Sequence, residues 1–319
     1  PSRQQQEPGS DRPVQPHETC IGSCPSWNKS IEPVAARYVA RVMMGCVIHD
    51  QCLTQQAARP NPEIQMSDTK ASFTRLRLYV DDDLTTGMAL PLSRDQSHYL
   101  QNVMRRGEGD RVALFNGRDG EYWAQIVAAK RGAVIVEAAE QLRPQTPEPD
   151  LWLAFAPIKR AALAFLTAKA TELGVSKLIP VLTARTNSER VNTKRLRANA
   201  IEAAEQSERL SVPEIAEPLK FQKFLRDWPV DRRLLVGDET GTGRPVAEIA
   251  RQLAQTPGSL AVMTGPEGGF APDELDQLGE LPFVTSIGLG PRVLRADTAA
   301  LAALSVVQAI AGDWTSTRS

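Results

Sequence analysis

Short apolar runs alternate with helix-like segments through the second half of the chain, and this alternation limits the possible folds more than any other feature. The runs that have the length and composition of buried strands are 151–157, 177–183, 233–237, 259–264 and 283–290. Helices are predicted between and after them, over 163–173, 193–209, 246–255, 272–280 and 298–311. Strands that alternate with helices pair in the same direction, so the pattern predicts an α/β domain with a mainly parallel sheet.

Residues 73–140 have a different pattern, in which strands follow one another almost without helices. The strands are predicted over 75–80, 111–116, 121–130 and 133–140. One short helix is expected after Ser93, because Gln96 stands at capping-box spacing from it. Short strands and one helix predict a small β-barrel, and the proline-bearing segment 142–150 is the predicted linker to the α/β domain.

The first 65 residues differ in composition from the rest of the chain. They begin with a polar, proline-bearing stretch that is typical of disorder, and Met66 opens a segment that looks like a natural protein start. We therefore expect residues 1–65 to be a disordered extension, residues 66–145 to form the barrel and residues 150–316 to form the α/β domain. A native N-terminus near Pro1, measured by mass spectrometry, would contradict the first of these expectations.

All cysteines of the chain lie in this extension. They are Cys20, Cys24, Cys46 and Cys52, with irregular spacing and no C-x-x-C pair. Zinc ligands usually come at regular short spacings, so no metal site is predicted, and a thiol nucleophile is excluded from the main body.

Charge and hydropathy limit the partners. The 319 residues carry a formal net charge of −1, so a nucleic acid would have to be held by local basic patches. No apolar run approaches the length that spans a bilayer. We expect a cytoplasmic protein with no membrane partner.

Glycine-bearing loops follow three of the predicted strands, over 236–245, 265–270 and 287–297. The P-loop pattern is absent, and Val293 stands where a dinucleotide fingerprint needs its third glycine. Strand ends of an open parallel sheet are the usual ligand sites, and glycine lets a ligand approach the backbone closely. The loops therefore predict a nucleoside-bearing cofactor held by backbone groups.

Two of these loops carry a family resemblance. The stretches TGPEGGFAPDELDQL and SIGLGPRVLRADTAALAALSVVQAI resemble the RsmE family of 16S rRNA uridine-N3 methyltransferases, and KATELGVSKLIPVLTARTN and HYLQNVMRRGEGDRVALFNG are similar to further motifs of that family. The resemblance extends from about Arg75 to Trp314. It implies a SPOUT-type α/β fold with a C-terminal trefoil knot, an N-terminal PUA-like β-barrel that binds RNA, S-adenosylmethionine in the knot, and a homodimer.

The resemblance also assigns residues to the cofactor. They are Val236, Gly237, Gly265, Pro266, Glu267, Gly268, Gly269, Ile287, Leu289, Gly290, Val293 and Leu294. The family commonly has Glu where this chain has Asp297, so no role that depends on reach is given to Asp297. We expect Asp297 to be the N-cap of the last helix.

The chemistry calls for a positive charge near the target base. The N3–H of uridine is a weak nucleophile at neutral pH, so an enzyme must remove the proton or stabilise the anion at O2 or O4. Arg295 and Arg292 flank the cofactor loop, and a guanidinium stays charged and donates in a fixed fork. They are the predicted catalytic residues, and no metal is needed.

The predicted partner is small-subunit rRNA, either free or in the assembled small ribosomal subunit. Phosphate contacts are expected from Arg77, Arg105, Arg106, Arg185, Arg190, Lys194, Arg195 and Arg197, although the helical part of this set has the alternative of a simple solvated face. Glu205 and Arg209 have the spacing of a surface ion pair. Two other functions stay open: another SPOUT RNA methylation, such as ribose 2′-O-methylation, and non-catalytic RNA binding.

Overall fold

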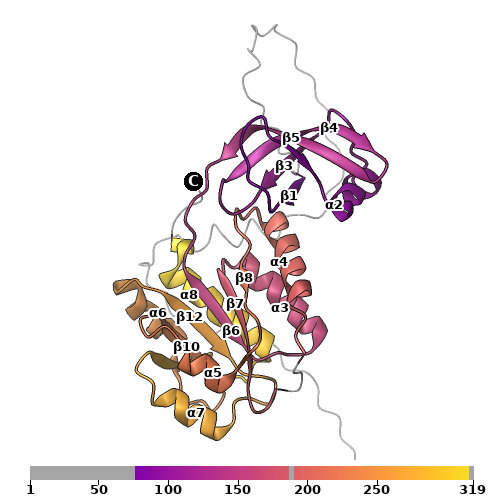
Figure 1. Ribbon diagram of the computed structural model, residues 1–319. Helices are drawn as coiled ribbons and strands as arrows, with labels where there is room; N and C mark the ends of the chain where they lie inside the picture. The colour runs from indigo at the N-terminus through magenta and orange to yellow at the C-terminus, as the bar shows by residue number, and fades with distance from the viewer. Residues whose placement is uncertain (1–75, 187–189, 316–319) are drawn as a thin grey trace, which may run out of the picture. The chain divides into compact units, whose positions relative to one another are not determined.

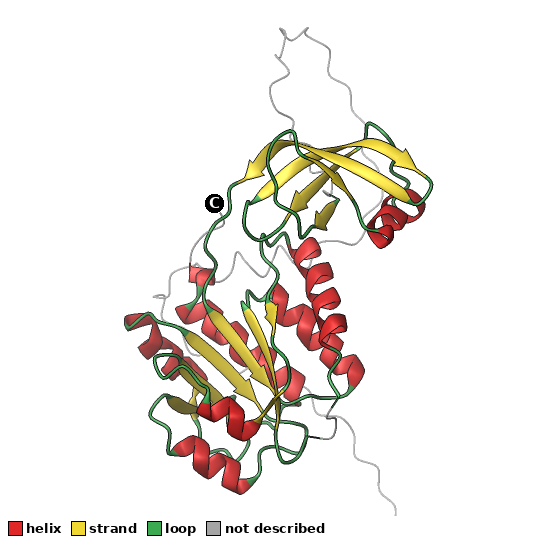
Figure 2. Cartoon of the chain, viewed as in Figure 1, coloured by secondary structure: helices red, strands yellow, loops and turns green. Residues whose placement is uncertain are grey.

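The computed structural model describes residues 76–186 and 190–315, which all lie in one compact unit, Lys70–Ser319. These residues form two sheets joined by one linker (Figures 1 and 2). The first sheet has five strands in the order β1-β3-β4-β5-β2, and the second has the order β11-β13-β10-β12-β6-β7-β8, with β9 also on β7. The extension predicted over residues 1–65 lies outside the described residues.

The first sheet holds the strands predicted for the barrel. Its elements are β1 (Arg77–Tyr79), β2 (Ala89–Pro91), α2 (Arg94–His98), η1 (Tyr99–Val103), β3 (Arg111–Phe115), β4 (Glu121–Lys130) and β5 (Ala133–Arg143). On β5 the residues Val134, Val136 and Ala138 are buried, and those between them are exposed, as the alternating pattern predicts. Strand β2 was not predicted, because three residues are too short for a periodic signal.

The helix predicted after Ser93 begins where its capping box places it. The Ser93 hydroxyl accepts a hydrogen bond from the Gln96 backbone N–H at 3.3 Å, and the Gln96 side chain accepts one from the Ser93 N–H at 3.2 Å. From Tyr99 the chain continues as a π-helix, η1, with Leu100 fully buried in the core of this domain.

The second sheet confirms the predicted parallel α/β pattern. Its strands are β6 (Leu151–Phe155), β7 (Lys177–Leu182), β8 (Glu214–Ile215), β9 (Leu219–Lys220), β10 (Arg233–Gly237), β11 (Arg244–Pro245), β12 (Leu260–Thr264) and β13 (Val284–Gly288), and its described pairings are parallel. The helical elements are α3 (Arg160–Glu172), α4 (Thr193–Ser207), α5 (Phe221–Arg226), α6 (Val246–Gln255), α7 (Pro272–Gly279), α8 (Ala296–Ala311) and η2 (Asp313–Thr315). Among these, α5 and the two-residue strands β8, β9 and β11 were not predicted.

Helices cover both faces of this sheet, so its strands are apolar on both sides. Leu153 and Leu235 face one core cluster with residues of α3, α4, α6 and α8. Their chain neighbours Ala154 and Leu234 face a second cluster with residues of α5 and α7. The result is a three-layer arrangement that leaves the loops at the strand ends accessible to a ligand.

The predicted C-terminal end of α3 is confirmed, and the predicted N-cap of α8 is wrong. Gly174 follows α3 with φ of +86°, the left-handed conformation expected of a residue that ends a helix. The N-cap of α8 is Arg295, not Asp297. Asp297 lies inside the first turn and its carboxylate accepts from the Thr298 N–H at 2.8 Å, where the helix dipole favours a negative charge.

A buried ion network overturns the RNA-contact prediction for Arg77. Its side chain is on the β1 strand face that α4 covers, and the residue is only 4% exposed. The guanidinium donates to Glu121 at 2.5 Å and to the backbone oxygens of Ala204, Glu205 and Arg209. Arg143 donates to the other Glu121 oxygen at 2.8 Å. Arg77 therefore joins β1 to the end of α4 and has no free surface for phosphate.

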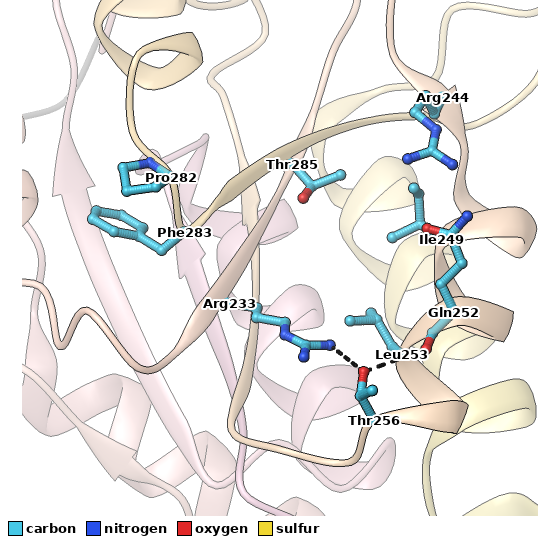
Figure 3. A pocket seen from close by; sticks show the side chains of 9 residues that line it. All are labelled: Arg233, Arg244, Ile249, Gln252, Leu253, Thr256, Pro282, Phe283 and Thr285. Atoms are coloured by element: carbon cyan, nitrogen blue, oxygen red, sulfur yellow. Dashed lines mark hydrogen bonds between the residues drawn. The ribbon is translucent and has the colours of Figure 1, made fainter.

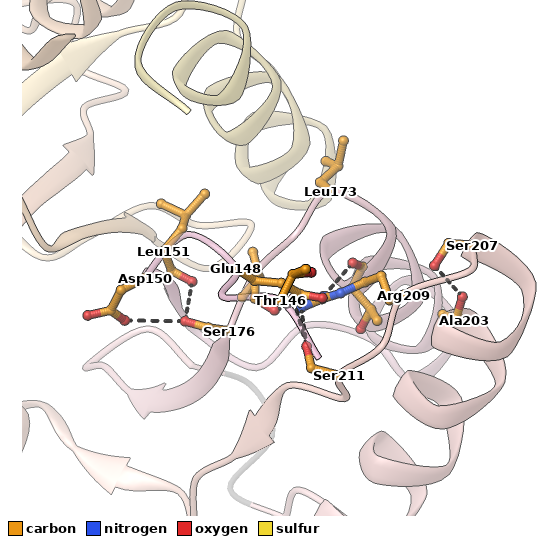
Figure 4. A network of polar contacts seen from close by, with 12 residues as sticks. Thr146, Glu148, Asp150, Leu151, Leu173, Ser176, Ala203, Ser207, Arg209 and Ser211 are labelled. Carbon is orange, nitrogen blue, oxygen red and sulfur yellow. Dashed lines mark hydrogen bonds and ion pairs between the residues drawn. The ribbon is translucent and has the colours of Figure 1, made fainter. Parts of the chain in front are cut away.

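The predicted surface pair between Glu205 and Arg209 is also wrong. The Glu205 carboxylate accepts from the Tyr79 N–H at 3.0 Å, and burial raises the pKa of this carboxyl. Arg209 instead pairs with Glu148 of the linker and donates to the Thr171 carbonyl at 2.6 Å (Figure 4). Both residues therefore bond to distant parts of the chain and not to each other.

Replacing Glu121 by Gln is expected to destabilise the fold by about 3 kcal/mol at pH 7, because it leaves two arginines without their counter-charge. Burial alone would raise the pKa of Glu121, but the hydrogen bonds from Arg77 and Arg143 outweigh it and lower that pKa below its ordinary 4.5. The stabilisation is present above that value and is lost as the pH falls through the lowered pKa. Urea unfolding from pH 7 to pH 3 measures this, with Glu140→Gln, an exposed strand residue, as the control. A penalty that stays constant down to pH 3 would contradict the account.

Candidate functional site

Three adjacent parallel strands bring the predicted cofactor residues together. Strand β10 pairs with β12 on one side, where Val236 is opposite Met263, and with β13 on the other, where Gly237 is opposite Ile287. The segments 236–237, 265–269 and 287–294 therefore leave the same edge of the sheet, although they are far apart in the sequence.

At this edge the strand ends are buried and the loops form an open rim. Val236 and Ile287 are buried, and Leu289 packs against the main core cluster. Pro266 is buried as well. Other predicted cofactor residues are exposed: Glu267, Gly268, Gly290 and Val293, the last at 88%.

The loop from Gly265 to Ala271 is built around the ring of Phe270. This ring is 1% exposed, and a Cβ on Gly265 would lie 3.1 Å from it, which explains a glycine there. The Gly269 N–H closes the turn by donating to the Pro266 carbonyl at 2.9 Å. Pro266 and Phe270 thus anchor the loop, while its central residues face outward.

Three other side chains hold the same loop from outside. The Glu239 carboxylate, in the loop after β10, accepts from the Phe270 N–H at 2.8 Å. Arg185, after β7, donates to the Gly268 carbonyl at 2.8 Å. Glu274, in the first turn of α7, accepts from the Ala271 N–H at 2.9 Å and from the Ala184 N–H at 2.8 Å.

Sequence reasoning missed Glu239 and Glu274 as site residues. For Glu274 a signal was present, since an acidic residue three positions after the residue that begins a helix often bonds back to its N–H. For Glu239 there was none, because its partner Phe270 is 31 residues away in the sequence.

The predicted catalytic arginines lie beside the cofactor loops. Arg292 and Arg295 are both exposed, and they follow β13 immediately before α8. Within the described part of the chain, neither takes part in an ion pair. Their guanidinium groups are therefore available to a ligand.

The remaining residues predicted to contact RNA are exposed and fall into two groups. The first runs from the end of β7 into α4 and comprises Arg185, Arg190, Lys194, Arg195 and Arg197. The second, Arg105 and Arg106, follows η1 in the barrel sheet. Arg197 is partly engaged already, since it donates to Asp81 at 2.9 Å. Arg106 has a long ion pair, in which its guanidinium nitrogen is 3.8 Å from the Asp110 carboxylate.

A cavity of about 340 Å³ lies elsewhere on the α/β domain (Figure 3). It is lined by Arg233, Arg244, Ile249, Gln252, Leu253, Thr256, Pro282, Phe283 and Thr285. Arg233 begins β10, and Pro282 and Phe283 precede β13, so most of the lining is at the amino ends of these strands or on α6. None of the predicted site residues lines it.

Comparison with known proteins identifies the family of the chain. Residues 145–308 match an RNA methyltransferase domain model, and residues 92–138 match an RNA methyltransferase PUA domain model. Ribosomal RNA small subunit methyltransferase E of Rickettsia conorii is 35% identical over 233 residues, which is 73% of this chain and 94% of that protein. The chain belongs to the ribosomal RNA small subunit methyltransferase E family.

Solved structures of similar proteins agree in fold. The Neisseria gonorrhoeae member aligns with a TM-score of 0.68 at 24% identity, over 75% of this chain and 99% of the other. A methyltransferase structure from Legionella pneumophila, solved with bound S-adenosylmethionine, aligns with a TM-score of 0.64 at 29% identity, over 74% and 97% of the two chains. The SPOUT-type α/β domain and the PUA-like domain are thus confirmed, and the trefoil knot stays a prediction.

Two further searches concern the described residues alone. No helix among them is long and apolar enough to cross a bilayer. No cluster of three or more His, Cys, Asp or Glu side chains there is arranged to hold a metal ion.

Replacing Gly269 by Ala is expected to destabilise the protein by about 1–2 kcal/mol, since its φ of +69° is unfavourable for a residue with a Cβ. The new methyl group would also lie 2.1 Å from the Glu239 carboxylate and displace it from the Phe270 N–H. Urea unfolding measures the difference. Gly258→Ala is the matched control, because its Cβ would meet no atom within 4 Å. Equal stability of the two variants would contradict the described loop.

Proposed function

We propose that this protein transfers the methyl group of S-adenosylmethionine to N3 of one uridine in small-subunit rRNA. The observation that carries the proposal is the meeting of GPEGG and LGPRVLR, the two motifs of the family, at one edge of the parallel sheet. The relatives named ribosomal RNA small subunit methyltransferase E support the substrate class. The choice of uridine N3 comes from the family resemblance.

The residues at this edge fit a nucleoside-bearing cofactor. Leu289, half-buried after the end of β13, offers an apolar side chain for a flat base, and Gly268 and Gly290 leave backbone groups accessible. A Cβ on Gly290 would meet nothing within 4 Å, so that side of the rim is open. S-adenosylmethionine, when bound, supplies an electrophilic methyl group on a sulfonium.

The protein must then make N3 of the uridine nucleophilic. Loss of the N3 proton to solvent water leaves negative charge on the ring that spreads to O2 and O4. Arg295 is exposed, forms no ion pair among the described residues and is adjacent to the cofactor loops. It is our first candidate to donate to one of these oxygens. Arg292 on the same loop is the second candidate. Orientation of the base against the methyl group supplies further acceleration.

The RNA is held by phosphate contacts along the basic segment 185–197. This segment leads from the carboxyl end of β7, the same sheet edge from which the cofactor loops emerge. Arg105 and Arg106 in the PUA-like domain add a second group. Contacts of this kind fix the position of the RNA, and the base is read in an unstacked, accessible conformation.

A homodimer is part of the proposal. Val293 is an apolar residue on the rim of the cofactor site with 88% of its surface exposed. Burying such a side chain against a second copy is favourable by about 1.5–3 kcal/mol. Light scattering of the purified protein gives its mass and decides between monomer and dimer.

The decisive experiment uses labelled S-adenosylmethionine and small ribosomal subunits that lack the modification. The full chain is expected to place label at one uridine, and digestion followed by mass spectrometry should identify N3-methyluridine. Label on a ribose would show that the reaction is 2′-O-methylation and not methylation of N3. Absence of label, together with intact RNA binding, would leave a non-catalytic RNA-binding protein.

Replacing Arg295 by Ala should lower kcat by about 10²–10³-fold, the usual effect of removing one donor to a developing anion. The KM for S-adenosylmethionine should change much less, because the arginine acts on the base. Single-turnover rates with saturating subunits measure this. Arg251→Ala, which removes an exposed arginine from α6, is the control. Equal rates for the two variants would show that Arg295 has no role in the reaction.

A further inference from the structure

The turn at the end of β7 is tied to the cofactor loop at two points. This turn, residues 183–186, is closed by two hydrogen bonds of its own: the Thr186 N–H donates to the Thr183 carbonyl at 3.1 Å, and the Thr186 hydroxyl accepts from the Thr183 N–H at 2.9 Å. The basic segment that we propose for RNA begins in the same turn, at Arg185. The turn 183–186 therefore belongs both to the contacts of the cofactor loop and to the segment proposed to bind RNA.

Arg185 makes the first tie. One terminal nitrogen donates to the Gly268 carbonyl at 2.8 Å, and a Cβ on Gly268 would lie 3.7 Å from the Arg185 Cδ, so the arginine stem runs along the loop. The residue is exposed, and no other side-chain bond of Arg185 is found within the described residues. The rest of the guanidinium fork is thus open to a phosphate.

Glu274 makes the second tie. It is 4% exposed, and its two oxygens accept from Ala184 in the turn and from Ala271 at the end of the cofactor loop, at 2.8 and 2.9 Å. Moving the turn away from the loop would leave a buried carboxylate or a backbone N–H without its partner, which is costly. The two segments must therefore move together.

We infer that Arg185 is a positioning residue that makes RNA and cofactor binding cooperative. A phosphate bound to the free side of its guanidinium fixes the side chain whose remaining N–H holds Gly268, and a cofactor bound to the loop fixes the same side chain for the RNA. The ligand that binds first pays the entropy cost of ordering the shared unit, so the second ligand binds more tightly. By linkage the effect is equal in both directions. This inference rests on the proposed function.

The test measures the affinity of S-adenosylhomocysteine, the unreactive product, for the full chain by equilibrium dialysis. The protein is used alone and with saturating small ribosomal subunits that lack the modification. For the wild type, the subunits are expected to tighten binding by about tenfold, within the usual range of coupling between two sites. For Arg185→Ala this ratio should fall to about one. Arg185→Lys keeps the positive charge but loses the fork that can bond Gly268 and a phosphate together. It should restore part of the ratio.

Arg195→Ala is the matched control. It removes the same charge from the same segment, but Arg195 has no described bond to the cofactor loop. It should weaken subunit binding and leave the tenfold ratio intact. In steady-state kinetics, Arg185→Ala should raise the KM for S-adenosylmethionine at saturating subunits, whereas Arg195→Ala should raise only the KM for the subunits.

The outcomes separate this inference from the function beneath it. A wild-type ratio near one, with normal S-adenosylhomocysteine binding, would overturn the coupling and leave the proposed function standing. The same follows if Arg195→Ala reduces the ratio as much as Arg185→Ala. If the wild type does not bind S-adenosylhomocysteine with or without subunits, the cofactor assignment and the coupling both fall.

Discussion

The parallel pairing of β10 with both β12 and β13 is the interaction on which the site depends. It places the ends of three strands in one row, so that loops distant in the sequence become neighbours. The strands can lie there because helices cover both faces of the sheet and bury alternate residues on each side. Any change that shifted this register would separate Gly237 from Ile287 and displace the loops that follow β10 and β13 relative to one another.

The rigidity of the site comes from a second level of contacts. The cofactor loop has glycines at its centre, so its own side chains hold it only at Pro266 and Phe270. Carboxylates from two neighbouring segments and one arginine supply the rest, each bonding to the loop backbone. These bonds fix the backbone of the loop from outside, so no side chain of the loop itself has to occupy the space that a ligand needs.

The same logic operates where β1 meets α4. Arg77 and Arg143 share Glu121, and Arg77 also takes three backbone oxygens at the end of α4. A positive charge that looked available for RNA is thereby used inside the protein. The residues proposed to bind phosphate in the basic segment are exposed, unlike Arg77.

The sequence by itself determined the longer strands, most of the helices and the location of the cofactor loops, because these follow from periodicity and from short motifs. It also indicated the family, since GPEGG and LGPRVLR are local patterns. Only the tertiary structure decided the partners of Arg77, Glu239, Glu274 and Arg185. Apart from the local bond between Glu274 and Ala271, their bonds join residues 31 to 132 positions apart, and no local pattern records which distant group a side chain will reach.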